Sequence, residues 1–167
     1  MKFIDLENLQ LKTFTESDAL DYCQLNNINP LNITELYLSY NELTNISGIK
    51  LFKNLEILSL EKNQLTDISV IQNLKNLKLL DINYTKIKNI SVLKNLNKLE
   101  DLNISNNQIT DISVIQHLNN LERLDIVNLE LESDQFKYIN SLLKILKLYG
   151  VLMDLKICQQ LKNLIKT

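Results

Sequence analysis

A 22-residue spacing of leucines constrains this chain more than any other feature. Leucines recur at that interval without slippage at Leu36, Leu58, Leu80, Leu102, Leu124 and Leu146. A spacing held over six copies is typical of stacked repeats, in which each repeat contacts only its neighbours. At 167 residues the chain has the length of one ordinary domain. The sequence therefore predicts a single elongated repeat domain over residues 1–167.

The first half of each repeat has the pattern of a β-strand with one buried face. Each copy reads L-x-x-L-x-L, with leucine or isoleucine at these places, and the copies begin at Ile33, Leu55, Leu77, Leu99, Leu121 and Leu143. Apolar residues two apart lie on one face of a strand, and the residues between them face the other way. A single strand of this kind cannot bury its apolar face alone. Stacked neighbours can, so we expect the core to be a continuous column.

Asparagine occupies the ninth position of three repeats, at Asn41, Asn63 and Asn107. There the chain leaves the strand and must satisfy backbone groups in a dry interior. A carboxamide both donates and accepts hydrogen bonds, so stacked asparagines can serve the backbone of adjacent turns. Thr85 takes this place in one repeat, and Leu129 and Val151 take it in the last two. We expect the row of asparagines to be interrupted at Thr85 and to be absent at the C-terminal end.

The second half of each middle repeat predicts a short helical turn. In "LTDISVIQNLKN" the spacing directs Ile68, Ile71 and Leu74 inward, and Ser69 stands where an N-cap would. Only about ten residues are available for the return to the next strand, which is too few for a long α-helix. We therefore expect 3₁₀ turns on the face opposite the strands.

The N-terminal part departs from the regular repeat. Segment 6–14 has the spacing of a further strand, through Leu6, Leu9 and Leu11. The next unit begins only at Ile33, which is later than the regular spacing would place it. We expect a strand in this segment, followed by a longer connection than elsewhere.

The longer connection predicts an α-helix. Thr15 or Ser17 could cap it, and its inner face would carry Leu20, Cys23 and Leu25. Cys23 and Cys158 lie at opposite ends of the repeat series, too far apart for a disulfide within one stacked molecule. We expect both thiols to be buried.

The C-terminal part also has helical patterns. Phe136, Ile139 and Leu142 form one apolar stripe, and a second stripe follows at Leu155, Cys158, Leu161 and Ile165. A terminal helix can cover the open end of a repeat core. We divide the chain into a longer N-terminal repeat with a helix (1–32), five 22-residue repeats (33–142), and a C-terminal repeat with a capping helix (143–167).

The repeat "LEILSLEKNQLTDISVIQNLKN" resembles a leucine-rich repeat of the 22-residue type. This type occurs in bacterial internalins and in the leucine-rich regulatory subunit of protein phosphatase one. The resemblance covers about Leu6 to Leu164. It implies an α/β fold, a right-handed curved solenoid with a parallel sheet on its concave side. It also implies that the protein holds other macromolecules.

Strand residues that face away from the predicted core are candidates for partner contact. Ile57 and Leu79 are neighbouring apolar residues on this face, beside three tyrosines and a strip of aspartates. Exposed apolar and aromatic groups clustered on one face mark contact sites, although such a face can also simply be a soluble surface. The candidate binding residues are Glu35, Tyr37, Tyr40, Ile57, Glu61, Leu79, Asp81, Tyr84, Asp101, Asn103, Arg123 and Asp125.

Composition and residue types argue against several function classes. The net charge of -2 gives no general attraction to nucleic acid, and no stretch approaches the ~20 apolar residues of a membrane span. The single histidine, His117, has no partners for catalysis or metal binding, and Gly48 and Gly150 cannot build a phosphate loop. We expect no enzymatic activity, no cofactor and no metal site.

The sequence therefore predicts a protein-interaction module that binds a protein partner on its concave face, as a scaffold or a phosphatase-type regulator. Because "MKFIDLENLQLK" does not read as a signal peptide, we expect a cytoplasmic monomer. The alternative is a secreted or surface recognition protein of the internalin kind, which meets a host or foreign molecule. A third possibility is a structural segment of a larger protein.

Overall fold

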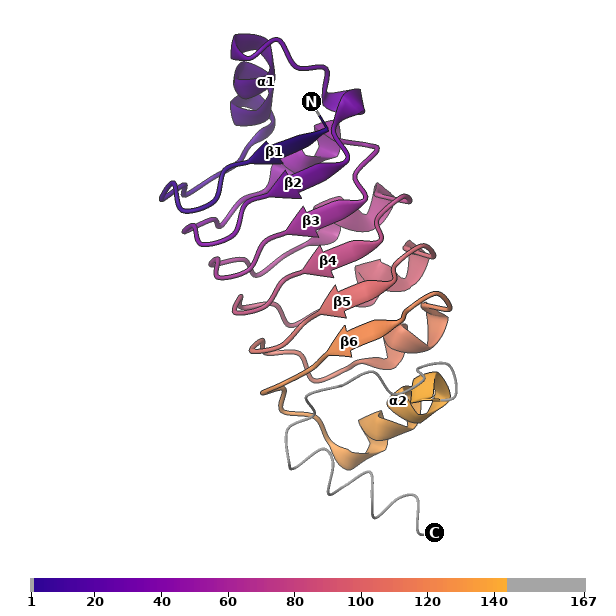
Figure 1. Cartoon of the computed structure of the whole chain (residues 1–167). Coiled ribbons are helices and arrows are strands. Elements are labelled where there is room, and N and C mark those ends of the chain that lie inside the picture. Colours follow the sequence, from indigo (N-terminus) through magenta and orange to yellow (C-terminus); the bar gives the residue numbers. More distant parts are fainter. Residues whose placement is uncertain (1, 144–167) are drawn as a thin grey trace.

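The computed structural model describes residues 2–143. Its strands form one six-stranded parallel sheet in the order β1-β2-β3-β4-β5-β6, and short 3₁₀ turns lie on the opposite side of the molecule (Figure 1). The strands are β1 (Phe3–Asp5), β2 (Glu35–Tyr37), β3 (Ile57–Ser59), β4 (Leu79–Asp81), β5 (Asp101–Asn103) and β6 (Arg123–Asp125). The helical elements are α1 (Glu16–Leu25), η1 (Pro30–Asn32), η2 (Ser47–Leu51), η3 (Ser69–Asn73), η4 (Ser91–Asn95), η5 (Ser113–His117), η6 (Ser133–Gln135) and α2 (Phe136–Leu143).

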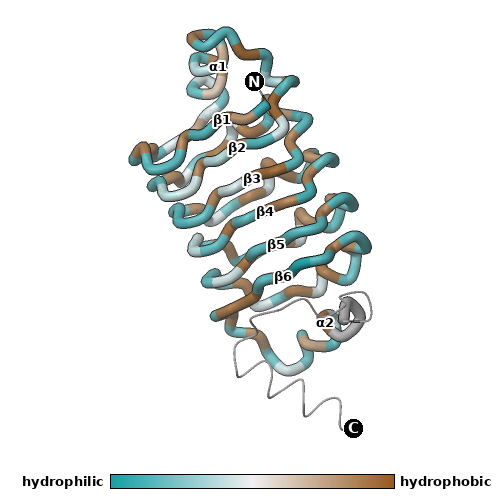
Figure 2. The backbone as a smooth tube through the Cα atoms, in the orientation of Figure 1, coloured by the Kyte–Doolittle hydropathy of each residue, from teal (hydrophilic) through white to brown (hydrophobic). Residues whose placement is uncertain are grey.

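Each repeat forms one coil of the solenoid. Leu58 of β3 pairs with Leu80 of β4, and Leu80 pairs with Leu102 of β5, so the pairing register equals the sequence period. The strand leucines are buried, and Figure 2 shows the apolar stretches returning in every coil. The predicted solenoid and its continuous core are confirmed for the described coils.

The 3₁₀ turns form where the sequence predicts them, but their starts are stabilised differently. Ile68, Ile71 and Leu74 point into the core as expected. Ser69 is not the N-cap of η3, which begins after Ile68 without a side-chain cap. Instead, Asp67 accepts a hydrogen bond from the Ser69 amide at 2.7 Å and another from the Ser69 hydroxyl at 2.8 Å. The two oxygens of the carboxylate each accept one of these donors, so a single Asp67 side chain holds both the amide and the hydroxyl of Ser69.

The asparagine ladder, which consists of Asn41, Asn63 and Asn107, joins neighbouring coils as predicted. The Nδ2 of Asn63 donates to Leu38 O at 3.0 Å and to Leu60 O at 2.9 Å, and its Oδ1 accepts from Leu43 N at 2.9 Å. Leu38 and Leu43 belong to the preceding coil. Each asparagine therefore satisfies a carbonyl and an amide that its neighbour leaves inside the core.

Thr85 interrupts the ladder, as expected. Its Oγ1 lies 2.6 Å from Oδ1 of Asn107, which belongs to the following coil. It also lies 2.9 Å from the carbonyl oxygen of Ile82, which belongs to the same coil. Within residues 2–143 we find no hydrogen bond from the Thr85 side chain to the preceding coil. Leu129, at the same place two coils later, is half-buried against the core. Val151 lies outside the described residues.

The first coil differs from its prediction. Its strand is Phe3–Asp5, because Ile4 pairs with Leu36, so Ile4 and Leu6 hold the two buried positions. The strand predicted in 6–14 is wrong: Leu9 is 54% exposed, and Leu11 is only half-buried. The spacing of Leu6, Leu9 and Leu11 imitates the repeat, but only Ile4 and Leu6 stand in register with β2.

Helix α1 begins at a capping box, in which Thr15 is the N-cap and exchanges hydrogen bonds with Asp18. The Thr15 backbone amide donates to the Asp18 carboxylate and is the main reason that the pKa of Asp18 is lowered. Ala19 and Cys23 face the core, and burial raises the pKa of the Cys23 thiol. Leu20 and Leu25, which the sequence predicts to face inward, are exposed, because the small Ala19 allows α1 to lie close to η2.

At the other end of the described chain, α2 packs against η5. Phe136 and Ile139 are buried there, so the predicted stripe closes the core after β6. Leu142, and the repeat from Leu143 onward with its second helix, lie outside the described side chains.

Candidate functional site

The candidate site lies on the sheet face, which is the side of β1–β6 that points away from the core. Strand residues alternate there between buried leucine or isoleucine and partly exposed neighbours, as in the pattern of β3 and β4. Because the pairing register equals the sequence period, equivalent positions of successive repeats form rows across the sheet. All twelve residues predicted for partner contact lie on this face or on the turns that follow its strands.

A groove of about 600 Å³ crosses the sheet face at the N-terminal ends of the strands. Ile57 and Leu79 lie side by side in it and are only half-buried, although they are apolar. Asp101 and Arg123 continue the same row, and Arg123 donates a hydrogen bond to the Asp101 carboxylate. This ion pair is a feature that the separate sequence positions did not predict.

A second row of residues, all charged, lines the groove and was not predicted from the sequence. It consists of Glu56, Lys78, Glu100 and Glu122, which also line the groove. Lys78 Nζ lies 2.8 Å from Glu56 Oε2, which raises the pKa of Lys78 and lowers that of Glu56. The signal was present in the sequence, since the second position is charged in four successive repeats.

A smaller hollow of about 230 Å³ adjoins the groove and shares Leu79, Asp101 and Arg123 with it. Asp81 and Asp125 line this hollow. None of the ion pairs within residues 2–143 involves either of these two carboxylates. The groove and the hollow together form one continuous surface, which we call the sheet-face groove.

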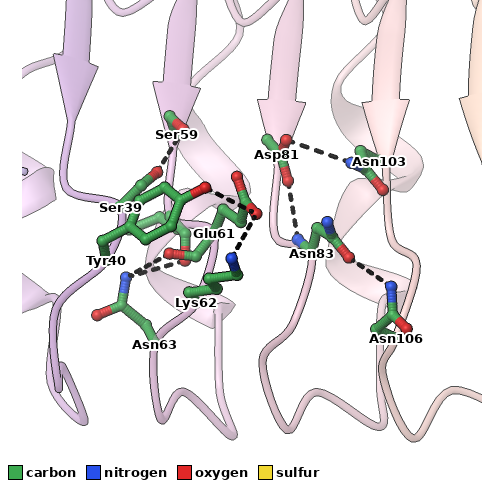
Figure 3. A network of polar contacts seen from close by, with 11 residues as sticks. Ser39, Tyr40, Ser59, Glu61, Lys62, Asn63, Asp81, Asn83, Asn103 and Asn106 are labelled. Carbon is green, nitrogen blue, oxygen red and sulfur yellow. Dashed lines mark hydrogen bonds and ion pairs between the residues drawn. The ribbon is translucent and has the colours of Figure 1, made fainter.

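Asp81 is a half-buried carboxylate of the sheet-face groove with a raised pKa. Burial raises its pKa, while hydrogen bonds from the Asn83 amide at 2.8 Å and the Asn103 side chain at 3.3 Å act in the opposite sense (Figure 3). The negative charge of Glu61 adds to the rise. A cation placed beside Asp81 would relieve this penalty.

The predicted tyrosines do not gather in the groove. Tyr40 and Tyr84 lie beyond the C-terminal ends of the strands, with Lys62 between them. The Lys62 Nζ is 4.6 Å from the Tyr40 ring centroid and 5.7 Å from that of Tyr84. Tyr40 also donates to Glu61 at 3.4 Å (Figure 3). These residues form a separate ridge, defined by Tyr40, Lys62 and Tyr84.

All three ridge residues have positive φ, between 51° and 57°. The same position is left-handed in the neighbouring coils, at Asn106 and Asn128. Asparagine tolerates this conformation, whereas tyrosine and lysine adopt it at a cost. Because the left-handed turn recurs in each coil, it is a requirement of the fold, and the ridge side chains are not needed to make it.

Tyr37 and Glu35 lie on β2, where Glu35 is the register partner of Ile57 on β3. The Tyr37 hydroxyl donates to Glu35 Oε2 at 2.8 Å. This hydrogen bond is the main reason that the pKa of Tyr37 rises to about 12. Eleven of the twelve predicted residues therefore fall into the groove, the ridge and this pair, and Glu61 lies beside the ridge, where it accepts from Tyr40. The twelve do not form one cluster.

His117 is exposed at the end of η5. Among residues 2–143, no three histidine, cysteine or acidic side chains lie close enough together to hold a metal ion. No helix in that range is both long and apolar enough to cross a membrane.

Comparisons with known proteins agree with this geometry. The family model for leucine-rich repeats, in two copies, matches residues 31–73 and 53–95. The structure of internalin C2 from Listeria monocytogenes is similar with a TM-score of 0.68 and 28% identity, over 78% of this chain and 53% of that one. The chain is a leucine-rich repeat protein.

Two further structures show how widely this leucine-rich repeat fold is shared. A leucine-rich repeat protein of Leptospira interrogans aligns with a TM-score of 0.69 and 25% identity, over 99% of this chain and 47% of that one. The ectodomain of the receptor kinase SOBIR1 from Arabidopsis thaliana aligns with a TM-score of 0.59 and 28% identity, over 77% of this chain and 71% of that one. No curated protein matches the sequence.

The leucine-rich repeat protein described here spans about half the length of internalin C2 and of the Leptospira protein. Leucine-rich repeat domains are generally binding modules for proteins and not enzymes. The similar structures include internalins and a receptor ectodomain, which fits that general role.

Proposed function

We propose that this leucine-rich repeat protein is a non-enzymatic module that binds a protein partner through the sheet-face groove. The observation that carries the proposal is the pair Ile57 and Leu79, two apolar side chains left partly exposed side by side in a groove of about 600 Å³. The core is complete without them, because their neighbours Leu58 and Leu80 are already buried. Apolar groups in a concave surface are typical anchors of a protein interface.

The charges around the groove favour a partner with basic residues at its rim. Carboxylates outnumber cations on this surface, and Asp81 and Asp125 have no ion pair within the described residues. The carboxylates concerned are Glu56, Asp81, Glu100, Asp101, Glu122 and Asp125, against Lys78 and Arg123. Complementary rim charges chiefly raise the association rate and fix orientation. Binding should therefore weaken as salt is added.

The test is affinity capture from source cells with two matched variants. Ile57→Asp/Leu79→Asp places charges at the apolar centre, and Gln72→Asp/Gln116→Asp places the same charges on exposed positions of η3 and η5. We expect the first variant to lose at least about tenfold in partner recovery, which corresponds to ~1.4 kcal/mol, and the second to bind like the wild type. Equal recovery by all three proteins would contradict the proposal.

Two cellular roles fit such a module, and they differ in location. A cytoplasmic scaffold or phosphatase-type regulator is the first candidate. A secreted or surface recognition protein is the second, and the similarity to internalins and to a receptor ectodomain favours it. Fractionation of source cells, combined with protease treatment of intact cells, separates the two. Loss of the protein on protease treatment indicates the surface role, and its survival in the cytosolic fraction indicates the other.

A further inference from the structure

Within residues 2–143, no strand pairs with the outer edge of the sheet at β1. β1 is the first strand of the order, and its only neighbour among the described strands is β2 (Figure 1). The carbonyl of Lys2 accepts from Glu35 N at 3.1 Å, and Leu6 N donates to Tyr37 O at 2.9 Å. A parallel pair uses alternate residues of each strand. The amide and carbonyl groups of Phe3 and Asp5 therefore point away from β2, toward the outer edge.

Apolar surface is concentrated at the same end of the molecule. Apart from two tyrosines of the ridge, every large hydrophobic side chain recorded as exposed within residues 2–143 belongs to the segment from Phe3 to Leu31. These side chains are Phe3, Leu9, Leu20, Leu25 and Leu31. Figure 2 shows apolar segments near α1 and the N-terminus. Terminal coils of a solenoid normally carry a polar outer face, so this end has the character of an interface.

We propose that two copies of the chain pair through β1, antiparallel and about a two-fold axis, so that their sheets become continuous. In this arrangement Phe3 of one copy lies opposite Asp5 of the other, and each pair exchanges two backbone hydrogen bonds. Ile4 then lies opposite Ile4 of the second copy, at the two-fold axis. Both copies contribute the same strand, β1, to the interface, as a closed two-fold interface requires.

The pairing register follows from the faces of β1. A shift of one residue would place the buried Ile4 on the face of the exposed Phe3. A shift of two residues toward the C-terminus would set Asp5 against Asp5, and like charges directly opposite one another are destabilising. The register with Ile4 at the axis avoids both.

The charges of the strand favour the antiparallel direction. Lys2 stands at its beginning, and Asp5 and Glu7 stand toward its end. Antiparallel pairing brings Lys2 of one copy toward the acidic end of the other. A parallel arrangement would instead align like charges. The expected partner of this edge is thus a second copy, which replaces the monomer that we expected from the sequence.

Sedimentation equilibrium of the full chain tests the pairing. Between about 1 µM and about 1 mM protein, a range that covers affinities of about −8 to −4 kcal/mol, the average mass should rise from 19.4 kDa toward twice that value and no further. Phe3→Pro removes an outward amide without touching the bonds to β2. We expect this variant to keep the mass of one chain over the whole range, with a circular dichroism spectrum like the wild type.

A charge swap provides a second test that does not depend on how Phe3→Pro folds. Lys2→Glu should weaken self-association at least about fivefold, the scale of one close charge pair. Lys2→Glu/Glu7→Lys, which has the composition and net charge of the wild type, should restore it. A wild-type mass of one chain at every concentration would overturn the proposal. So would a dimer that neither Phe3→Pro nor Lys2→Glu weakens, or growth beyond two chains.

Discussion

Single side chains with both a donor and an acceptor hold neighbouring coils together in this protein. Asn41 shows it most fully: its Nδ2 donates to Leu6 O at 2.8 Å, and its Oδ1 accepts from Leu9 N and Leu11 N, each at 3.0 Å. A buried backbone group without a partner costs about 1–3 kcal/mol. The asparagine ladder therefore stabilises the turns after the strands, where no backbone partner is available.

Thr85→Asn should raise the stability of the protein. An asparagine there would stand in register with Asn63 and Asn107, and could donate to Leu60 O and accept from Leu65 N of the preceding coil. We expect the free energy of unfolding in urea to rise by about 1 kcal/mol, the net value of one such hydrogen bond. Thr85→Val, which removes the hydroxyl, is the control and should lower it. A loss of stability in Thr85→Asn would show that the coil at Thr85 has no room for the amide.

Asp81→Asn should stabilise the protein at neutral pH. Because burial raises the folded-state pKa of Asp81, the folded state binds a proton more readily than the unfolded chain does, and the cost of the charge appears as the pH rises through that pKa. The gain of the variant should therefore be present near pH 7 and vanish below the ordinary aspartate value of 3.8.

Asp111→Asn is the control with the opposite sign for this measurement. The pKa of Asp111 is lowered, chiefly by the hydrogen bond from the Ser113 amide at 2.8 Å. Its stabilising contribution is present above the unfolded value and is lost as the pH falls, so the variant should be less stable near pH 7. Urea unfolding of both variants and the wild type at several pH values measures the differences. Equal pH dependence of all three would contradict the assignment.

At the scale of elements, the first helix is held by a close approach to the first 3₁₀ turn of the regular coils. Gly48 of η2 stands where the next three coils have valine, at Val70, Val92 and Val114. Its amide donates to Phe14 O at 2.8 Å, and a Cβ at Gly48 would lie 2.4 Å from the Thr15 carbonyl oxygen. The missing side chain lets α1 sit directly on η2. Phe14 and Phe52 stack beside this contact, with ring centroids 6.1 Å apart.

Gly48→Ala should destabilise the N-terminal coil. The added methyl group would clash with backbone and not with a flexible side chain, so α1 must move, at a cost of about 1–3 kcal/mol. In hydrogen exchange, the amides of α1 should exchange faster in Gly48→Ala than in the wild type, whereas those of β5 should exchange at the wild-type rate. Val70→Ala, at the equivalent place in η3, is the control and should leave the exchange of α1 unchanged. Unchanged exchange of α1 in Gly48→Ala would contradict this account.

At the scale of the whole molecule, each coil is stabilised by the coils on either side. Leu102 lies between Leu80 and Leu124 in the strand register and is fully buried. The stability of such a stack is a sum of coil and interface contributions, so a central defect weakens two interfaces. The two ends of the described chain differ: α2 packs against η5 after β6, whereas no described strand pairs with the outer edge of β1.

Leu102→Ala should cost about 2–5 kcal/mol, as expected for a buried leucine. Hydrogen exchange should accelerate in β4 and β6 as well as in β5, since both neighbours lose a contact. Ile4→Ala, in the first coil, should accelerate exchange only in β1 and β2. Exchange changes confined to β5 in Leu102→Ala would show that the coils do not share one core.

The regular coils could be predicted from the sequence alone. The constant repeat period, combined with apolar residues two apart, determines that Leu58, Leu80 and Leu102 face the core once the coils stack. The same period identified the rows of the sheet face, and with them Ile57, Leu79 and the aspartates. These features depend only on the position of a residue within its repeat.

Features that depend on contacts between coils of different sequence were decided only by the tertiary structure. The strand of the first coil is Phe3–Asp5 and not a part of 6–14, because pairing with β2 selects Ile4. Helix α1 turns Ala19 inward and leaves Leu20 exposed, because the space at Gly48 admits only a small side chain. The Arg123 contact with Asp101 and the separation of groove from ridge likewise arise from side chains of different coils. A periodic pattern specifies which face of a coil a residue occupies. Which residue it contacts there is decided only when neighbouring coils pack together.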